Sequence, residues 1–342
     1  MPRQRTAISG KRLISMLAQV CCGIVIVLGI GLGVRQMLRV RAELSEPPGW
    51  RIIRPPAEVT TLVIDGEVVW TGGKDGLTLI DRRTGAVRAL PLGAPAFSYV
   101  RGMVRDTTGA IWIAHDGGLA RYAGGRWTVF TPETGAPFQH ALSVMEARDH
   151  TLWVGTAKEL ACYAHGTWTR IVPATPIVAA NSLYQDREGI IWVGCSDAFH
   201  GGLYRYDGKS WRAFGLADGL PHTAVTMVLE DHAGTLWVTT GQANQGGLAR
   251  WRAGRWEAAP VPPKLNGVKM RSVFEDRAGR VWFGSEYDGI AVQNARGWQG
   301  FTARDGLAGS EVLAMAQDAD GVYWLGTNTG LSRITRFASV DQ

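Results

Sequence analysis

The residues that could do chemistry in this 342-residue chain are polar side chains placed at a fixed distance before a recurring tryptophan. Arg101, Asn181, Thr226 and Arg271 each stand eleven residues before a tryptophan in a strand-like run. Guanidinium, amide and hydroxyl groups offer the donors and acceptors that suit the hydroxyl or carboxylate groups of a ligand. The sequence leaves open whether the two arginines receive an anion or pair with nearby acids.

Five further polar residues accompany these positions in the expected fold. They precede the innermost strand of a repeat or belong to the two longest polar loops, and they are His140, His200, His222, Gln242 and Asn244. The two loops read "CSDAFHGG" and "TGQANQGG", whereas the corresponding loop of the last repeat is only "TNTG". Extra polar loop length on adjacent repeats indicates a ligand site, with a plain surface insertion as the alternative. Phe199 or Tyr287 could add a stacking surface.

Catalytic and metal-binding motifs are not found in the sequence. There is no GxSxG, no HExxH and no Cys/His metal spacing, and the seven histidines are scattered. The segment "DADG" resembles the start of a calcium loop, but "DREG", "DHAG" and "DRAG" occupy the same place in other repeats, so it is a turn between strands. We therefore predict no catalytic residue, metal or cofactor. Cys162 and Cys195 are expected to be buried thiols, with pairing in an oxidising compartment left open.

Seven tryptophans define a repeat that must position the polar residues. They recur every 39 to 45 residues and are Trp70, Trp112, Trp153, Trp192, Trp237, Trp282 and Trp324. Each repeat holds four short apolar runs separated by Gly- or Asp-rich turns, and a second tryptophan usually opens the fourth run. Four short strands per unit of about 40 residues are typical of a propeller blade. We predict an all-β fold, a seven-bladed β-propeller of four-stranded blades.

The last repeat has no fourth run of its own. The segment "PGWRIIRPP" resembles a fourth run, yet it precedes the first repeat. Residues 49–54 are therefore predicted to be the closing strand of the last blade, because closure leaves no open sheet edge. The expected propeller spans residues 49–336, and residues 337–342 form a C-terminal tail.

One repeat, "SLYQDREGIIWVGCSDAFHGGLYRYDGKSWRAFGLADGLP", resembles the two-component regulator propeller repeat almost throughout. The resemblance extends over roughly residues 49–336 in seven copies. The first copy departs from it by a shortened first turn, and the third has Ala147 where an aspartate usually stands. The resemblance implies a sensory or ligand-binding propeller, of the kind that forms the extracytoplasmic sensor of histidine kinases or cyclases and often responds to carbohydrates.

The N-terminal region is predicted to hold the chain in a membrane. Residues 13–34 contain no charge, and a helix of 22 residues spans about 33 Å, enough for a hydrocarbon core of ~30 Å. We expect a basic cytoplasmic tail (1–12), one transmembrane helix (13–34) and a linker (35–48), with a cleaved signal peptide as the alternative. The propeller then lies in the periplasm or outside the cell, on a bacterial inner membrane.

The charge of the chain argues against nucleic acid as a partner. Seven of the 36 basic residues lie in residues 1–42, which contain no acid, so 36 − 7 = 29 basic residues face 30 acidic ones in the remainder. A nearly neutral propeller has no electrostatic attraction for phosphates.

The leading functional hypothesis is an accessory sensor subunit that binds a carbohydrate or another small molecule. No kinase, cyclase or DNA-binding segment follows the repeats, so the signal is expected to pass to a separate protein such as a histidine kinase. The site is expected on the top face, over blades 4 and 5 and the adjoining channel mouth. The alternatives are a propeller hydrolase or lyase acting on polysaccharide, which turnover would reveal, and an envelope assembly scaffold.

The predicted topology can be tested by proteolysis. Because the basic flank before residues 13–34 favours a cytoplasmic N-terminus, protease added to spheroplasts should digest the propeller. Digestion of an N-terminal tag together with protection of the propeller would reverse the orientation.

Overall fold

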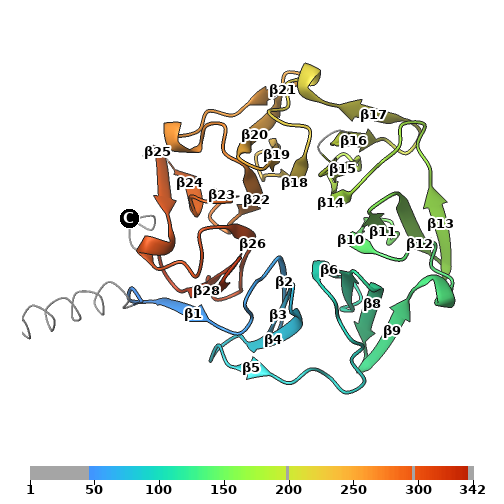
Figure 1. Cartoon of the computed structure of the whole chain (residues 1–342), viewed down its shortest axis with the longest axis horizontal. Helices are drawn as coiled ribbons and strands as arrows, with labels where there is room; N and C mark the ends of the chain where they lie inside the picture. The colour runs from blue at the N-terminus through green and yellow to red at the C-terminus, as the bar shows by residue number, and fades with distance from the viewer. Residues whose placement is uncertain (1–45, 198–199, 295–296, 338–342) are drawn as a thin grey trace, which may run out of the picture. The chain divides into compact units, whose positions relative to one another are not determined.

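Seven sheets, each of four antiparallel strands, make up the part of the chain that the structure describes, residues 46–197, 200–294 and 297–337 of a computed structural model. Figure 1 shows the sheets arranged around a central axis, with the first strand of each sheet innermost. This is the predicted seven-bladed propeller of four-stranded blades. Residues 13–34, the predicted transmembrane helix, lie outside the described residues. Within the described ranges, no helix has the length and apolar character needed to span a bilayer.

Blades 1 to 4 follow one another along the chain. Blade 1 contains β2 (Thr61–Asp65), β3 (Val68–Gly73), β4 (Gly76–Asp81) and β5 (Val87–Arg88). Blade 2 contains β6 (Val100–Arg105), β7 (Ile111–His115), β8 (Gly118–Ala123) and β9 (Arg126–Phe130). Blade 3 contains β10 (Ala141–Glu146), β11 (Leu152–Thr156), β12 (Leu160–Ala164) and β13 (Thr167–Ile171). Blade 4 contains β14 (Ala180–Gln185), β15 (Ile191–Cys195), β16 (Gly202–Tyr206) and β17 (Trp211–Phe214).

Blades 5 to 7 complete the ring. Blade 5 contains β18 (Val225–Glu230), β19 (Leu236–Gln242), β20 (Gln245–Arg252) and β21 (Arg255–Ala258). Blade 6 contains β22 (Met270–Glu275), β23 (Val281–Ser285), β24 (Ile290–Asn294) and β25 (Gly297–Phe301). Blade 7 contains β26 (Val312–Gln317), β27 (Tyr323–Thr327), β28 (Gly330–Ile334) and β1 (Trp50–Ile53). Short 3-10 helices in four blade connections are η1 (Pro132–Thr134), η2 (Leu216–Asp218), η3 (Pro263–Leu265) and η4 (Ala303–Asp305).

The recurring tryptophans fill the gaps between blades. The second strand of a blade is buried on both faces, as in the run of buried residues Leu152–Thr156. Its tryptophan contacts an aromatic ring on the third strand of the next blade, as in Trp70 with Tyr122 at 5.4 Å between ring centroids and Trp112 with Tyr163 at 6.2 Å. An aromatic side chain buries about 150–250 Å², or roughly 4–6 kcal/mol of transfer free energy at ~25 cal/mol per Å². The blades are therefore joined by packing between neighbours.

A buried aspartate ties the first turn of five blades to the same tryptophan. In blade 6, Oδ2 of Asp276 accepts a hydrogen bond from Nε1 of Trp282 at 2.8 Å, and Oδ1 accepts from the backbone N–H groups of Ala278 and Arg280. The other pairs, with 2.7–3.2 Å between the two atoms, are Asp106 with Trp112, Asp186 with Trp192, Asp231 with Trp237 and Asp318 with Trp324. The carboxylates of these "DxxG" turns therefore accept hydrogen bonds within the fold.

Closure of the ring joins the two ends of the propeller. β1 pairs antiparallel with β28, with Trp50 opposite Ile334 and Ile53 opposite Leu331. Phe337, which the sequence assigns to the tail, is fully buried and contacts Trp50 at 5.1 Å and Trp282 at 4.8 Å between ring centroids. The third strand of blade 7 carries Ile334 where blades 2 to 5 have an aromatic ring, and Phe337 packs beside it against Trp282.

The two cysteines of the propeller are free and buried. Burial raises the pKa of both the Cys162 and the Cys195 thiol to about 12. They belong to one core cluster without forming a disulfide.

The Asp276 carboxyl group is expected to make the free energy of unfolding depend on pH. Burial raises the pKa of Asp276, but hydrogen bonds from Arg280, Trp282 and Tyr323 outweigh burial and hold it below 3.8. A carboxyl group with a depressed folded-state pKa stabilises the fold fully above its unfolded pKa and loses this contribution as the pH falls through the folded one. Asp276→Asn should therefore lower the free energy of unfolding by about 1.5–3 kcal/mol near neutral pH, with a smaller loss near about pH 3. Urea unfolding at both pH values measures this.

The control for that experiment is Glu188→Gln, which changes an exposed carboxylate in the turn of blade 4. It should leave unfolding unchanged. An equal loss for Asp276→Asn at both pH values would exclude the ionised carboxylate as the stabilising group.

The role of Phe337 can be tested by truncating its side chain. Phe337→Ala should lower the free energy of unfolding by about 3–5 kcal/mol, because it empties the gap between blades 6 and 7. Val172→Ala, a change at an 80% exposed side chain, should have little effect in the same urea titration. An unchanged midpoint for Phe337→Ala would show that the closing blade does not depend on this residue.

Candidate functional site

A β-bulge in the first strand directs one side chain per blade toward the central channel. In six blades the register shifts between the first and second strands at a single residue, and these residues are Arg101, Leu142, Asn181, Thr226, Arg271 and Leu313. Each is the residue eleven places before the tryptophan of its blade. A bulge leaves its extra residue unpaired and re-aims its side chain. In blade 1, which has a shorter first turn, Thr60 takes the corresponding place.

Hydrogen bonds between neighbouring blades hold these innermost strands in register. Oγ of Ser143 donates to the carbonyl of Ala180 at 2.7 Å, and Oγ1 of Thr226 donates to the carbonyl of Met270 at 2.8 Å. Thr60 and Ser272 make equivalent bonds to the next blade, at 2.6 and 2.8 Å. The acceptors lie one residue before a bulge, so the position of each bulge is fixed by the blade before it.

The bulged residues line a cavity of about 460 Å³ in the channel. All seven innermost strands contribute to it. Arg101, Asn181, Thr226 and Arg271, the four polar residues predicted from their spacing, are all on its wall. Apolar side chains further along the same strands complete the lining: Leu62, Met103, Val144, Leu183, Met227 and Met315. The arrangement is a polar rim above an apolar lower wall, which is typical of small-molecule pockets.

Arg101 is already paired with a carboxylate. Its Nε and Nη2 donate to the two carboxylate oxygens of Asp116 at 2.6 and 3.1 Å, and its guanidinium lies 4.1 Å from the centre of the Tyr99 ring. The hydrogen bond from Arg101 is the main cause that lowers the pKa of Asp116. His140 contacts the backbone carbonyl of Asp116 through Nδ1, which adds a second blade to this cluster.

Arg271 is also paired with acids. Its Nη2 contacts the Glu311 carboxylate and lies 3.7 Å from Oε1 of Glu286, which in turn receives Nζ of Lys269 at 3.0 Å on its other oxygen. The sequence left open whether Arg101 and Arg271 receive an anion or pair with nearby acids. In this structure both arginines pair with acids of nearby loops. A ligand at this rim meets compensated ion pairs instead of bare cations.

Four other predicted residues lie away from the cavity lining. Nδ1 of His222 accepts a hydrogen bond from the N–H of Ala224 at 2.9 Å, and burial lowers its pKa. The exposed His200 lies 3.3 Å from a carboxylate oxygen of Asp197. Gln242 and Asn244 are exposed at the tip of a hairpin.

The expected long loop of blade 5 is mostly strand. β19 extends to Gln242, β20 begins at Gln245, and these two residues face each other in the ladder. The segment therefore lengthens the sheet and leaves only a two-residue turn, in which Ala243 has a positive φ of 48°. Phe199, the expected stacking residue of blade 4, lies outside the described residues. Tyr287 is 59% exposed.

A second position of the repeat also places side chains, several of them charged, at the rim of the channel. The spacing used to predict the site residues did not include this position. Glu58, Tyr99 and Glu311 also line the cavity, and each lies two residues before the innermost residue of its blade. The same position is His140 in blade 3 and Lys269 in blade 6. In blades 4 and 5 it is alanine. These residues lie thirteen places before the tryptophan of their blade, or twelve in blade 1, so the sequence spacing could have identified them. Their polar and charged side chains belong to blades 6, 7, 1, 2 and 3.

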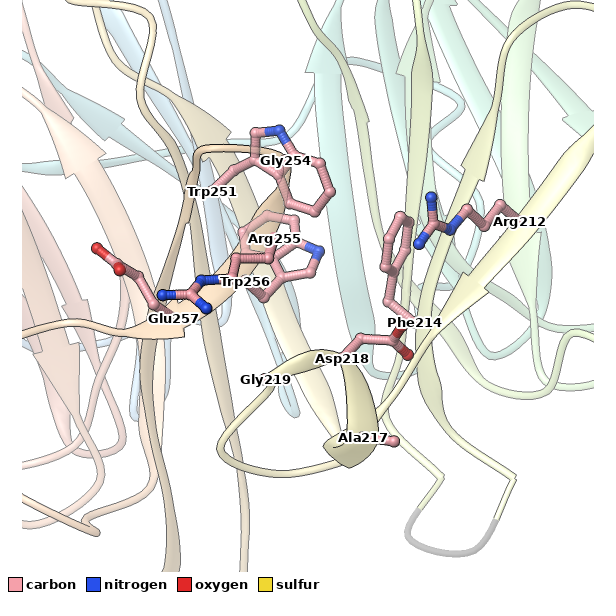
Figure 2. A pocket seen from close by; sticks show the side chains of 10 residues that line it. All are labelled: Arg212, Phe214, Ala217, Asp218, Gly219, Trp251, Gly254, Arg255, Trp256 and Glu257. Carbon is pink, nitrogen blue, oxygen red and sulfur yellow. The ribbon is translucent and has the colours of Figure 1, made fainter.

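A second cavity, of about 440 Å³, lies between the outer strands of blades 4 and 5 (Figure 2). Figure 2 shows Arg212 against Phe214 on one side and Trp251 and Trp256 on the other. The aromatic rings contact each other, with 5.5 Å between the centroids of Phe214 and Trp251. Its lining contains two arginines and two acids but none of the predicted site residues. The channel cavity is therefore the stronger candidate site.

The fold and this channel define a seven-bladed propeller with a polar channel mouth, and comparison with known proteins adds its repeat type. Four segments match the family described as two component regulator propeller: residues 174–197, 219–242, 264–287 and 306–329. The chain thus carries two-component regulator propeller repeats. No curated protein sequence matches it significantly.

Several solved structures share the fold. The extracellular domain of the putative hybrid two component system BT3049 from B. thetaiotaomicron has a TM-score of 0.71 at 17% identity, covering 86% of this chain and 42% of that chain. The extracellular domain of the putative one component system BT4673 from the same organism has a TM-score of 0.68 at 20% identity, covering 84% and 39%. Virginiamycin B lyase from Staphylococcus aureus has a TM-score of 0.65 at 10% identity, covering 84% and 98%. This chain spans less than half of the two sensor structures.

Proposed function

We propose that this protein is a ligand-recognition propeller of a sensory system, which binds a carbohydrate or another polyhydroxylated small molecule at the channel mouth. The observation that carries the proposal is the cavity of about 460 Å³ whose wall gathers one bulged residue from nearly every blade. Pockets for small ligands are concave, partly apolar and provided with a few convergent polar groups. The channel has all three properties.

The pairing of the two arginines favours a ligand rich in hydroxyl groups. A free carboxylate would compete with Asp116 and Glu311 for guanidinium groups that are already engaged. Hydroxyl groups can instead accept from and donate to the members of these ion pairs. Asn181 is exposed on the cavity wall, and within the described residues its amide has no hydrogen-bond partner. Its amide is therefore free to bind a ligand directly.

The cellular setting belongs to the same proposal. The fold resembles extracellular domains of sensor systems, which supports an extracytoplasmic propeller. We place it on the bacterial inner membrane, facing the periplasm or the exterior, with the uncharged residues 13–34 as its single-pass anchor. The bound state would be conveyed to a separate signalling protein such as a histidine kinase.

An enzymatic function is the alternative that the comparisons raise. A structure of virginiamycin B lyase is described as catalytically inactive through a histidine-to-alanine change, so that propeller works through a histidine. Among the described residues, the channel lining of this chain includes no histidine. Release of product from a polysaccharide panel would favour the hydrolase or lyase.

The proposed site can be tested with two amide residues in contrasting places. After a screen of oligosaccharides identifies a binder, Asn181→Ala should weaken it roughly 2- to 13-fold, the value of one neutral hydrogen bond of about 0.5–1.5 kcal/mol. Gln242→Ala removes an amide from the exposed hairpin tip and should leave the dissociation constant unchanged. Isothermal titration calorimetry on the full chain measures both variants. Equal affinity for wild type and Asn181→Ala would place the ligand outside the channel.

A further inference from the structure

The charges at the channel mouth do not cancel within the protein. The described mouth gathers four carboxylates, Glu58, Asp116, Glu286 and Glu311, against three cations, Arg101, Lys269 and Arg271. Each cation contacts at least one of the last three carboxylates. Among these seven side chains, one negative charge is left over.

The residual charge lies on Glu58. Among the described residues, no lysine, arginine or histidine nitrogen comes within 4.0 Å of its carboxylate, and its Oε1 is buried without a hydrogen bond. The Tyr99 side chain interacts with this carboxylate, because burial first, and then the charge of Glu58 and a side-chain hydrogen bond with it, raise the pKa of Tyr99. A buried carboxylate oxygen without a donor loses solvation and gains no hydrogen bond in exchange. A donor supplied by a ligand would remove this deficit.

The position of Glu58 makes the carboxylate accessible to a ligand. It lines the same cavity as Asn181, Thr226 and Arg271. Lys269 and Arg271 are engaged with Glu286 and Glu311. Arg101 is held by both oxygens of Asp116. Among the described residues, none of these three cations forms an ion pair with Glu58; Asp116 first, and then the charge of Glu58, raise the pKa of Arg101.

We infer that the ligand carries a protonated primary amine, which Glu58 receives at the channel mouth while Asn181 binds a hydroxyl group of the same molecule. This inference rests on the proposed function and specifies its ligand as an amino sugar with a free amine. An ammonium group has three donors and no acceptor, so it can donate to the one oxygen of Glu58, Oε1, that lacks a hydrogen bond. Hydrogen bonds between charged groups are shorter and stronger than neutral ones. A neutral or acidic sugar leaves the charge of Glu58 uncompensated.

The test compares ligands that differ only at the amine. Chitotriose, the β-1,4 trimer of glucosamine, and its fully N-acetylated form are titrated into the full-length protein by calorimetry. Chitotriose should bind at least about 10-fold more tightly, since one charged hydrogen bond corresponds to a factor of roughly 10 to 150. Glu58→Gln should remove this preference, and Glu58→Asp, which keeps the charge on a shorter side chain, should reduce it.

The matched control is Glu188→Gln, which removes one carboxylate from a remote exposed turn and should preserve the preference. Thermal unfolding of each variant checks that its fold is intact. Equal binding of the two trimers, absence of binding by both, or a preference that survives in Glu58→Gln would overturn the inference. Binding of 1,5-diaminopentane as tight as that of chitotriose and dependent on Glu58 would overturn the amino-sugar class and assign the ammonium to another kind of ligand.

The outcome also separates this inference from the proposed function. If a neutral oligosaccharide binds with dependence on Asn181 while chitotriose does not bind, the channel remains the ligand site and the amine is wrong. If chitotriose binds with no dependence on either Asn181 or Glu58, both proposals fail.

Discussion

In five of the seven blades the first hairpin contains one buried hydrogen bond, from the indole nitrogen of a second-strand tryptophan to a turn aspartate. In blade 4 this bond joins Trp192 to Asp186 at 2.7 Å, and the other carboxylate oxygen holds the backbone of the turn. A carboxylate satisfied in this way is tolerated in the core, whereas an unpaired one would be costly. In those five blades the bond holds the turn between the first and second strands, and blade 3, with Ala147 in place of the aspartate, has the same register without it.

That register determines which side chain reaches the channel. With the turn fixed, the bulge falls eleven residues before the tryptophan, at Asn181 in blade 4 and at Arg271 in blade 6. Hydroxyl-to-carbonyl bonds between adjacent first strands, such as that of Ser272 to Val312, then fix the bulges of neighbouring blades relative to each other. The two inner strands of each blade and their contacts with the neighbouring blades thus define the geometry of the channel.

The channel mouth combines rigidity with an uneven distribution of charge. Blades 4 and 5 place Ala179 and Ala224 at the rim, where blades 1, 6 and 7 place Glu58, Lys269 and Glu311. A seven-fold repeat would give a symmetric rim if its copies were identical. Substitution at one position of each copy makes the rim asymmetric, and an asymmetric rim can orient a ligand without any change in the fold.

The sequence by itself determined the number of blades, the strand order and four polar residues of the channel wall, because spacing to a buried tryptophan is a local property of each repeat. It also predicted the pairing of the segment around Trp50 with the last blade, since an open edge in a ring is unfavourable. Only the tertiary structure decided that Arg101 and Arg271 are neutralised, that Glu58 is not, and that Phe337 belongs to the core. Ion pairing and gap filling depend on distances between residues of different blades, and sequence spacing contains no information about those distances.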